Sequence, residues 1–443
     1  MQNNYDIIFF NSPIYRESIM DREDYLPPLG QGYIVTQLNE NGIKATIVDC
    51  VYEKMGVEEI INYINNGNFP NIAFNIFSVN KDLVKYILEN IKRKINIYIG
   101  GKAVEYLWKE MICWEWKQNT VIYTIGECDT IYTDLLLGRC LEKPIYRLKN
   151  QYIYCVKKES CYFPKDLNEI ILDRNLFKNR EIMNHYNRYE SSIITSRGCI
   201  YNCAFCGGSV YANSSSYVRM RNIDNIKTEI QRIIEINPNV ESIRVLDDLF
   251  LLNRERVSDA IKIFKCFSKL HWRAMAHINT FLKSLDLSEE LKKSGCDELF
   301  VGIESGDEEM RRLIHKQGTV NDVINVIRAL LQAGIDIKGY FICGFPNENK
   351  RQMDKTVELA LQIKKMSKET LGNFRATAFQ FRPYHGTELY DELKRNNKIM
   401  DKYYLENKTS SKKQYSYIAG NYSNVEEDYL KENIRRITEN SNV

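Results

Sequence analysis

The stretch Ser196-Arg-Gly-Cys199-Ile-Tyr-Asn-Cys203-Ala-Phe-Cys206-Gly-Gly208 decides how the second half of the chain folds. It places three thiols within eight residues, directly after a predicted strand, so that one loop can wrap all three around a metal centre. No second CxxC-type pair and no histidine within ten residues accompanies the group. A structural zinc site, which needs four ligands, therefore remains only as an alternative.

Three closely spaced thiolates favour an iron–sulfur centre, because thiolates are the usual ligands of such clusters. A cubane contains four irons, and three cysteines leave one of them without a protein ligand. That open iron is where a substrate could bind.

The composition describes a globular protein with no preference for a strongly charged partner. The chain has 443 residues, enough for two or three domains, and its 61 basic and 58 acidic side chains almost cancel. We expect no membrane association, since no stretch approaches the roughly 18 apolar residues of a membrane span, and nucleic-acid binding is disfavoured. The 12 cysteines are scattered apart from the tight group, which indicates reduced thiols in a cytoplasmic protein.

Residues 1–145 alternate short β-type runs with helical stretches, which predicts an α/β, Rossmann-like domain with a parallel sheet. The helical period is clear in 30–41 and 81–94. The predicted strands are Asp6–Asn11, Ala45–Asp49, Asn71–Phe77, Ile95–Gly100 and Val121–Ile125.

A second alternation predicts a partial (β/α)6 barrel over residues 189–390, in which chemistry would lie on the loops that follow the strands. Residues 146–188 do not show this alternation of strand and helix patterns, and we predict that they form a linker or cover segment. Residues 391–443 are predicted to form a helical extension. The six predicted barrel strands are Ser192–Thr195, Ser242–Leu246, His271–Ile278, Glu298–Ile303, Ile337–Cys343 and Thr377–Arg382.

The spacing Cys199-x3-Cys203-x2-Cys206, with Phe205 before the last cysteine, resembles the signature of radical S-adenosylmethionine (SAM) enzymes. The resemblance implies a [4Fe–4S] cluster whose open iron is chelated by SAM, and reductive cleavage of SAM to a 5′-deoxyadenosyl radical. It extends over about 200 residues. The cofactor-binding residues that it implies in the barrel are Phe205, Gly207, Asp247, Glu304, Ser305 and Gly344.

Each later motif also has a structural alternative: Glu304 could cap the following helix, and Gly344–Pro346 could be only a turn. The second-strand motif, Leu246-Asp-Asp-Leu-Phe250, departs from the glycine–glycine–glutamate of many relatives. The motif therefore does not identify the residue that would bind the SAM ammonium.

The first domain is similar to the cobalamin-binding domains that precede many radical SAM barrels, in Leu26–Tyr33, Lys44–Asp49 and the turn at Gly100 and Gly101. Gly100 and Gly101 are the implied cofactor-binding residues. No histidine occurs before His185, so this domain offers no imidazole to cobalt. An empty domain would show the same absence.

Two histidines are candidates for acid–base catalysis at the barrel mouth, His277 and His385. Packed or hydrogen-bonded structural roles are the alternative for both.

The leading hypothesis is a cobalamin-dependent radical SAM enzyme that methylates an unactivated carbon of a small-molecule or peptide substrate and receives electrons from a flavodoxin or ferredoxin. A radical SAM oxidoreductase, cyclase or rearrangement enzyme without bound cobalamin is the first alternative. Sulfur insertion into transfer RNA and a non-enzymatic redox-sensing module are the others.

Overall fold

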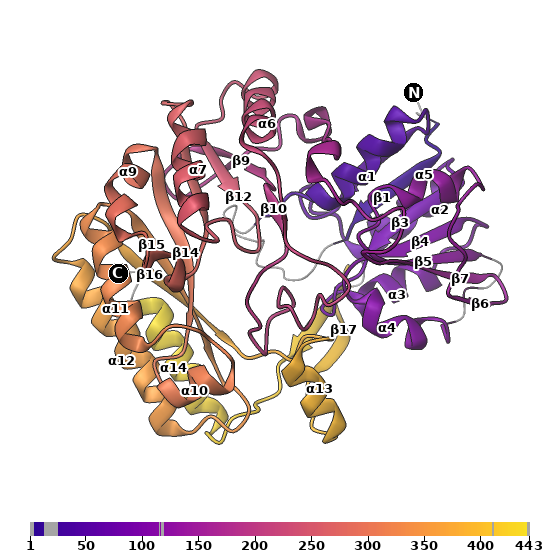
Figure 1. The fold of residues 1–443 in the computed structure, drawn as a ribbon. Coiled ribbons are helices and arrows are strands. Elements are labelled where there is room, and N and C mark those ends of the chain that lie inside the picture. The colour runs from indigo at the N-terminus through magenta and orange to yellow at the C-terminus, as the bar shows by residue number, and fades with distance from the viewer. Residues whose placement is uncertain (1–3, 13–24, 115, 117–118, 410–411, 441–443) are drawn as a thin grey trace. The chain divides into compact units, whose positions relative to one another are not determined.

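The structure is a computed structural model that describes residues 4–12, 25–114, 116, 119–409 and 412–440. The chain divides into two units (Figure 1). The first comprises residues 1–185, 214–219 and 402–418, and the second comprises residues 186–213, 220–401 and 419–443. No helix among the described residues is long and apolar enough to cross a membrane.

The first unit is built on a seven-stranded sheet in the order β2-β1-β3-β4-β5-β7-β6, whose first six strands are parallel. The strands of this sheet are β1 (Ile7–Asn11), β2 (Ala45–Asp49), β3 (Asn71–Asn75), β4 (Asn96–Gly100), β5 (Thr120–Gly126), β6 (Tyr146–Leu148) and β7 (Gln151–Val156). Its helices are α1 (Leu29–Glu40), α2 (Val57–Asn66), α3 (Lys81–Glu89), α4 (Val104–Met111) and α5 (Ile131–Leu136). The five predicted strands and the Rossmann-like parallel sheet are confirmed.

Alternating side chains bury both faces of this sheet. Ile8 and Phe10 of β1 join the apolar core that α2, α3 and α4 cover. Phe9, between them, points to the other face, where its ring lies 5.6 Å from that of Tyr132 in α5. Because both faces of the strand are buried, its sequence is a continuous run of apolar residues.

The predicted linker at 146–188 contains two strands that extend the first sheet. β7 pairs in parallel with β5, and β6 pairs antiparallel with β7. These are short strands at the sheet edge, and β6 is exposed, so they lack the apolar run of the central strands. The remainder of the segment forms two 3₁₀ turns and the short strand β8: Leu167–Glu169, Arg174–Phe177 and Ile182–Met183.

The second unit is a curved parallel sheet in which six strands lie in the order β16-β15-β14-β13-β12-β9. All six predicted barrel strands are present, as β9 (Tyr189–Ile193), β12 (Ser242–Val245), β13 (His271–Ala276), β14 (Cys296–Glu304), β15 (Asp336–Cys343) and β16 (Phe374–Gln380). Two-residue strands β10 (Ser196–Arg197) and β11 (Arg219–Met220) flank the cysteine loop in the sequence.

The helices that follow the strands of this sheet mostly line the outside of the half-barrel, but α13 lies apart from the others (Figure 1). They are α6 (Ile223–Ile236), α7 (Arg254–Lys265), α8 (Ile278–Phe281), α9 (Ser288–Lys293), α10 (Glu308–Leu313), α11 (Val320–Gln332), α12 (Lys350–Ser367) and α13 (Glu388–Arg395). One further 3₁₀ turn spans Leu285–Leu287. Capping boxes begin α11 at Thr319 and α12 at Asn349, and Gly334, with φ of +81°, lies just after the end of α11.

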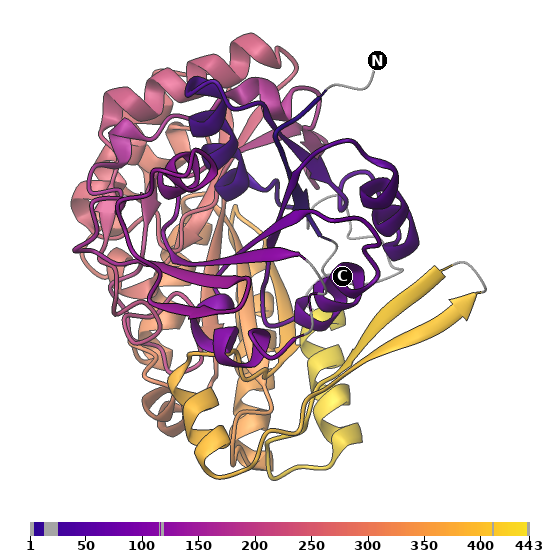
Figure 2. The ribbon, with the colours of Figure 1, turned by 90° about the vertical axis from the view of Figure 1, so that its right-hand side faces the viewer.

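The carboxy-terminal extension is only partly helical. α14 (Glu427–Asn440) packs on β16 and α12 in the second unit, with Leu430 and Ile437 fully buried. Between α13 and α14, however, the chain forms the antiparallel hairpin of β17 (Lys402–Thr409) and β18 (Lys412–Ile418), drawn in yellow in Figure 2. The predicted helical extension is present in α13 and α14, and the hairpin between them is an element that was not predicted, because its residues are polar or aromatic and no apolar run marks them.

Candidate active site

The three cysteines of the loop after β9 share one apolar environment. Cys203 is buried with Tyr201 and Leu249, and Cys199 and Cys206 pack against the same cluster. Among the described residues, no three His, Cys, Asp or Glu side chains are arranged to hold a single metal ion. The three cysteine ligands of a [4Fe–4S] cluster bind three different irons and need not converge on one point. The donor set therefore fits the cluster.

The loop backbone is bound on two sides by elements that follow other strands. The N–H of Ala204 donates to the carbonyl of Ile314 at 3.0 Å, and the carbonyl of Ala204 accepts from the N–H of Leu389 at 3.0 Å. Beyond it, the N–H of Gly208 donates to Sγ of Cys206 at 3.3 Å. These contacts fix the chain between Cys203 and Cys206.

Burial sets the electrostatics of the thiols. It raises the pKa of all three cysteines, that of Cys206 to about 11, while the Lys316 ammonium lowers the pKa of Cys199 and Cys203. Thiolates must form when a metal binds, so cluster binding and deprotonation are coupled. Lys316 is the cation that favours the charged state here.

The two carboxylates of the second-strand motif lie in different surroundings. Asp247 is 2% exposed, and its oxygens accept hydrogen bonds from Thr195 and Ser196. Asp248 is exposed, and its Oδ1 lies 3.3 Å from the position that a Cβ on Gly208 would occupy. Asp248 is therefore the carboxylate on the cysteine side.

Glu304 and Ser305, adjacent residues at the end of β14, also have different surroundings. Glu304 has φ of +66°, at a shift in the β14–β15 register, and its Oε1 lies 3.1 Å from Nζ of Lys316. A Cβ on Gly302 would lie 2.3 Å from Oε1 of Glu304 and 2.9 Å from Nζ of Lys316, so a side chain there would displace this ion pair. Ser305 is fully buried against Thr356 of α12. Of the two, Glu304 faces the cysteine loop, since its charge also raises the pKa of Cys203.

The turn after β15 is held by a residue that the sequence reasoning missed. Gly344 has φ of +88°, and the N–H groups of Gly344 and Phe345 donate to Oε2 of Glu348 at 2.6 and 3.2 Å. Glu348 is fully buried, and burial raises its pKa to about 7. An acidic residue four positions after a strand-end glycine was the available signal.

The other predicted residues occupy varied places. Phe205 packs edge-on against Phe345, with ring centroids 5.5 Å apart, and Gly207 borders open space, where an added Cβ would meet nothing within 4 Å. The ring of His385 lies 4.4 Å from that of Tyr390.

His277 is buried and stacked on Tyr201, with ring centroids 3.9 Å apart, while its Nδ1 accepts from the N–H of Asn279. Burial, with Lys316 and Arg311 nearby, lowers the pKa of His277 to about 2. The ring therefore stays neutral near pH 7, which does not favour a proton-transfer role.

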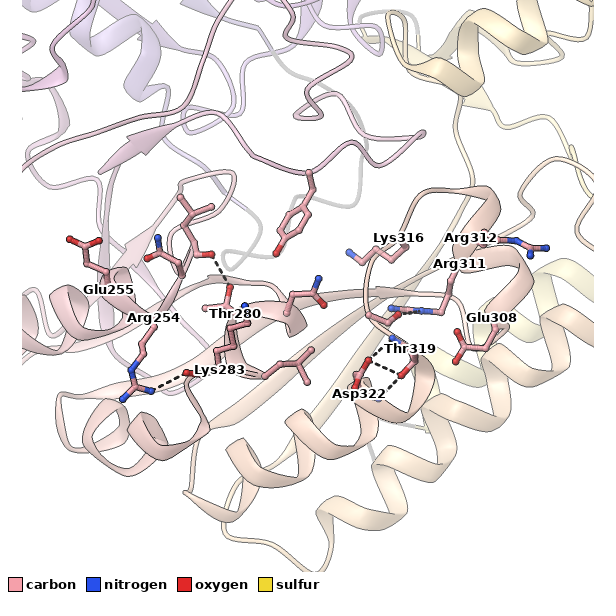
Figure 3. A pocket seen from close by; sticks show the side chains of 16 residues that line it. Arg254, Glu255, Thr280, Lys283, Glu308, Arg311, Arg312, Lys316, Thr319 and Asp322 are labelled. Atoms are coloured by element: carbon pink, nitrogen blue, oxygen red, sulfur yellow. Dashed lines mark hydrogen bonds between the residues drawn. The ribbon is translucent and has the colours of Figure 1, made fainter.

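A pocket of about 940 Å³ borders the cysteine loop (Figure 3). It lies between Tyr201 and the segments that follow β12, β13 and β14, and it includes Lys316 in its wall. The guanidinium of Arg311 forms its floor and donates to the carbonyls of Ile303, Ser305, Gln317 and Gly318. Arg311 thus ties the segment that carries Glu304 to the one that carries Lys316.

In the first unit, Gly100 and Gly101 end β4 at the carboxyl edge of the sheet. Gly101 has φ of +102°, and a Cβ there would lie 2.1 Å from Oδ1 of Asn75 and 2.5 Å from the carbonyl of Ile76. Three buried polar atoms have no hydrogen-bond partner among the described residues: Gln31 Oε1 in α1, Asn75 Oδ1 at the end of β3 and Thr133 Oγ1 in α5.

Comparisons with known proteins agree with this geometry. Residues 193–360 match the Radical SAM superfamily. An uncharacterized methyltransferase of Pyrococcus horikoshii is 29% identical over 396 residues, which cover 84% of this chain and 80% of that protein. The bacteriochlorophyllide d C-12(1)-methyltransferase of Chlorobaculum tepidum is 23% identical over 284 residues, which cover 62% of this chain and 56% of that protein.

Two solved structures share the fold across both units. The cobalamin-dependent SAM radical enzyme OxsB, with aqua-cobalamin and SAM bound, aligns with a TM-score of 0.68 at 14% identity, covering 98% of this chain and 66% of that one. The radical SAM methyltransferase TsrM from Kitasatospora setae, with cobalamin and a [4Fe–4S] cluster bound, aligns with a TM-score of 0.62 at 12% identity, covering 92% and 78%. With its cysteine loop, the matched segment 193–360 is a radical SAM domain, a domain that uses a [4Fe–4S] cluster and SAM, and the chain that carries it is an enzyme.

Proposed function

We propose that this enzyme is a cobalamin-dependent methyltransferase that adds a methyl group to an unactivated carbon of a small-molecule or peptide substrate. The observation that carries the proposal is the polar carboxyl edge of the first sheet. Buried polar groups are normally hydrogen-bonded, so three orphaned atoms at one edge indicate a bound group that completes them. Gly101 lets the chain pass close to Asn75 and Ile76, where a Cβ would overlap both, and so keeps the orphaned Asn75 amide at this edge.

Cobalamin fits this edge better than a dinucleotide does, because no GxGxxG motif follows a strand of the first sheet. Gln31, Asn75, Gly100, Gly101 and Thr133 would hold it. The unit has no histidine before His185, so the protein would supply no imidazole to cobalt. The names of the bacterial and archaeal relatives support methyl transfer, and the folds of OxsB and TsrM support the pairing of the two units.

In the barrel, residues near the cysteine loop are complementary to the cluster and to parts of SAM. Cys199, Cys203 and Cys206 would hold three irons of the cluster. Asp248 carries the exposed carboxylate for the SAM ammonium, and Lys316 the cation for its carboxylate. Gly344 would let the backbone approach the adenine ring.

The proposed methyl transfer requires these cofactors and an external electron donor. When bound, the cluster and SAM supply a 5′-deoxyadenosyl radical that takes hydrogen from the substrate, and cobalamin supplies a methyl carrier. The protein orients substrate, SAM and cobalamin and excludes competing reactions. A flavodoxin or ferredoxin would deliver the electron.

The test is transfer of an isotopic label. The reconstituted holoenzyme is incubated under reducing conditions with SAM carrying a deuterated methyl group and a small-molecule extract, and products are compared by mass spectrometry with those of Cys203→Ala. Deuterated methyl in a carbon-methylated product of the wild type alone supports the proposal. Formation of 5′-deoxyadenosine together with an oxidised, cyclised or rearranged product that carries no label would replace it with another radical SAM reaction.

A further inference from the structure

The carboxylate of Asp247, directly after β12, joins two neighbouring strand ends. Its Oδ1 accepts from the backbone N–H of Thr195 at 2.6 Å. Its Oδ2 accepts from the hydroxyls of Thr195 at 2.5 Å and Ser196 at 2.7 Å. All three donors are neutral groups, and Asp247, Thr195 and Ser196 are each at least 97% buried. Such buried networks fix a local conformation when every member is satisfied.

These bonds fix the start of the cysteine loop. Thr195 and Ser196 are followed by Arg197, Gly198 and then Cys199, the first predicted ligand. Gly198 has φ of +92°, so the chain turns sharply just after the bonded segment. The middle of the loop is held separately, through Ala204. Asp247 is therefore the side chain that ties the entry of the loop to the second barrel strand.

The neighbouring Asp248 has the opposite placement. It is exposed, and its Oδ1 lies 3.3 Å from the position that a Cβ on Gly208 would occupy, which places it beside the loop. The two carboxylates of the motif thus face different groups, one toward the strand end and one toward the cysteines.

We propose that Asp247 is a positioning residue that aligns the cluster loop through its bonds to Thr195 and Ser196, and that its negative charge has no role in binding SAM. The inference rests on the assignment of the three cysteines to a cluster. It departs from the family resemblance, which implies that this residue contacts the cofactor.

Hydrogen-bond chemistry separates the two roles. In Asp247→Asn, the amide oxygen can accept from the N–H of Thr195, and the amide NH₂ can donate to both hydroxyl oxygens, which also act as acceptors. The three contacts survive without the charge. Asp247→Ala removes them all, and Thr195→Val with Ser196→Ala removes the two hydroxyl contacts while nearly keeping side-chain volume.

The experiment compares these full-length variants after anaerobic reconstitution with iron and sulfide. The readouts are iron and sulfide per chain, the electron paramagnetic resonance spectrum of the reduced cluster with and without SAM, and the dissociation constant for SAM. We expect Asp247→Asn to keep the wild-type spectrum and a SAM affinity within about threefold, since only neutral hydrogen bonds are exchanged. Asp247→Ala and the double variant should both lose cluster or show an altered spectrum, and the double variant covers the case in which Asp247→Ala does not fold.

Asp248→Asn is the matched control, and it should keep the cluster while its SAM affinity falls by about tenfold or more, because a charge-assisted bond is lost. A comparable loss of SAM affinity in Asp247→Asn, with the cluster intact, would overturn the inference and make Asp247 a cofactor ligand. A wild-type spectrum in the double variant would overturn it as well. Absence of a cluster from the wild type would instead contradict the proposed function, and the inference with it.

Discussion

The ring of Phe205 lies 5.5 Å from the ring of Phe345, at an interplanar angle of 62°. Phe205 directly precedes Cys206, and Phe345 directly follows Gly344, so the cluster loop and the predicted adenine segment meet in one apolar contact. Phe345 belongs to a buried cluster with Phe381, which follows β16, and Tyr422 of the carboxy-terminal extension, and Phe205 packs against this cluster. Packing therefore couples the two segments that we propose to hold the cluster and SAM.

Replacing Phe345 by alanine should weaken both segments at once. The fully buried ring would leave a cavity that costs about 3 to 5 kcal/mol of unfolding free energy. Iron content and SAM affinity should fall together, as measured by iron assay and equilibrium dialysis. Phe74→Ala, at an equally buried site in the first unit, is the control: it should cost similar stability but leave the iron content unchanged. Equal iron content in both variants would contradict the coupling.

The Glu304–Lys316 pair should contribute more than a surface ion pair. Their side chains are 8% and 7% exposed, so Lys316→Met leaves a carboxylate that is nearly buried and unpaired, at a cost of about 3 kcal/mol. Adding Glu304→Gln should recover most of that loss. Lys265→Met breaks an exposed pair with Glu290 and should cost under about 1 kcal/mol in the same denaturation experiment. A surface-like cost for Lys316→Met would show that the pair is solvated.

Glu348 should make stability depend on pH. Because burial raises its pKa from 4.5 to about 7, its contribution to stability is complete below pH 4.5 and is lost as pH rises through about 7. Glu348→Gln stays neutral, so its stability relative to the wild type should improve across this window, by up to about 3 kcal/mol. Unfolding midpoints of both proteins between pH 5 and about 8 check this. Parallel curves would indicate that Glu348 titrates normally.

The bare backbone at Gly101 should be required for cobalamin retention. Gly101→Ala places a Cβ against Asn75 and Ile76, whereas Gly42→Ala has a comparable positive φ with nothing within 4 Å. Both substitutions strain the backbone, but only the first displaces Asn75, one of the residues proposed to hold cobalamin. Cobalt per chain, measured after reconstitution and desalting, should fall in Gly101→Ala alone. Equal retention would remove Gly101 from the site.

The sequence was sufficient for the elements whose patterns are local. Strands buried on both faces show continuous apolar runs, which identified the central strands of both sheets and the position of the cysteine loop. The edge strand β6 and the hairpin at 402–418 were missed, because their residues are polar or aromatic and no apolar run marks them.

The roles of individual site residues depended on tertiary contacts. Lys316 follows Glu304 by twelve residues, and only the fold brings the two charges together. Asp247 and Asp248 are adjacent and chemically identical, so their opposite surroundings could not be read from the motif. Glu348 accepts hydrogen bonds from two N–H groups of a turn, and its position four residues after Gly344 was the only sign of this contact in the sequence.

The most direct measurement is quantitation of 5′-deoxyadenosine and bound cobalt. Wild-type protein and Cys203→Ala are reconstituted anaerobically with iron, sulfide and hydroxocobalamin, desalted, and reduced in the presence of SAM. We expect bound cobalt in both proteins, because the first unit is intact in both. We expect 5′-deoxyadenosine only from the wild type. No 5′-deoxyadenosine from a wild-type protein with a full cluster would contradict radical SAM chemistry, and 5′-deoxyadenosine without cobalt would contradict the cobalamin-dependent assignment.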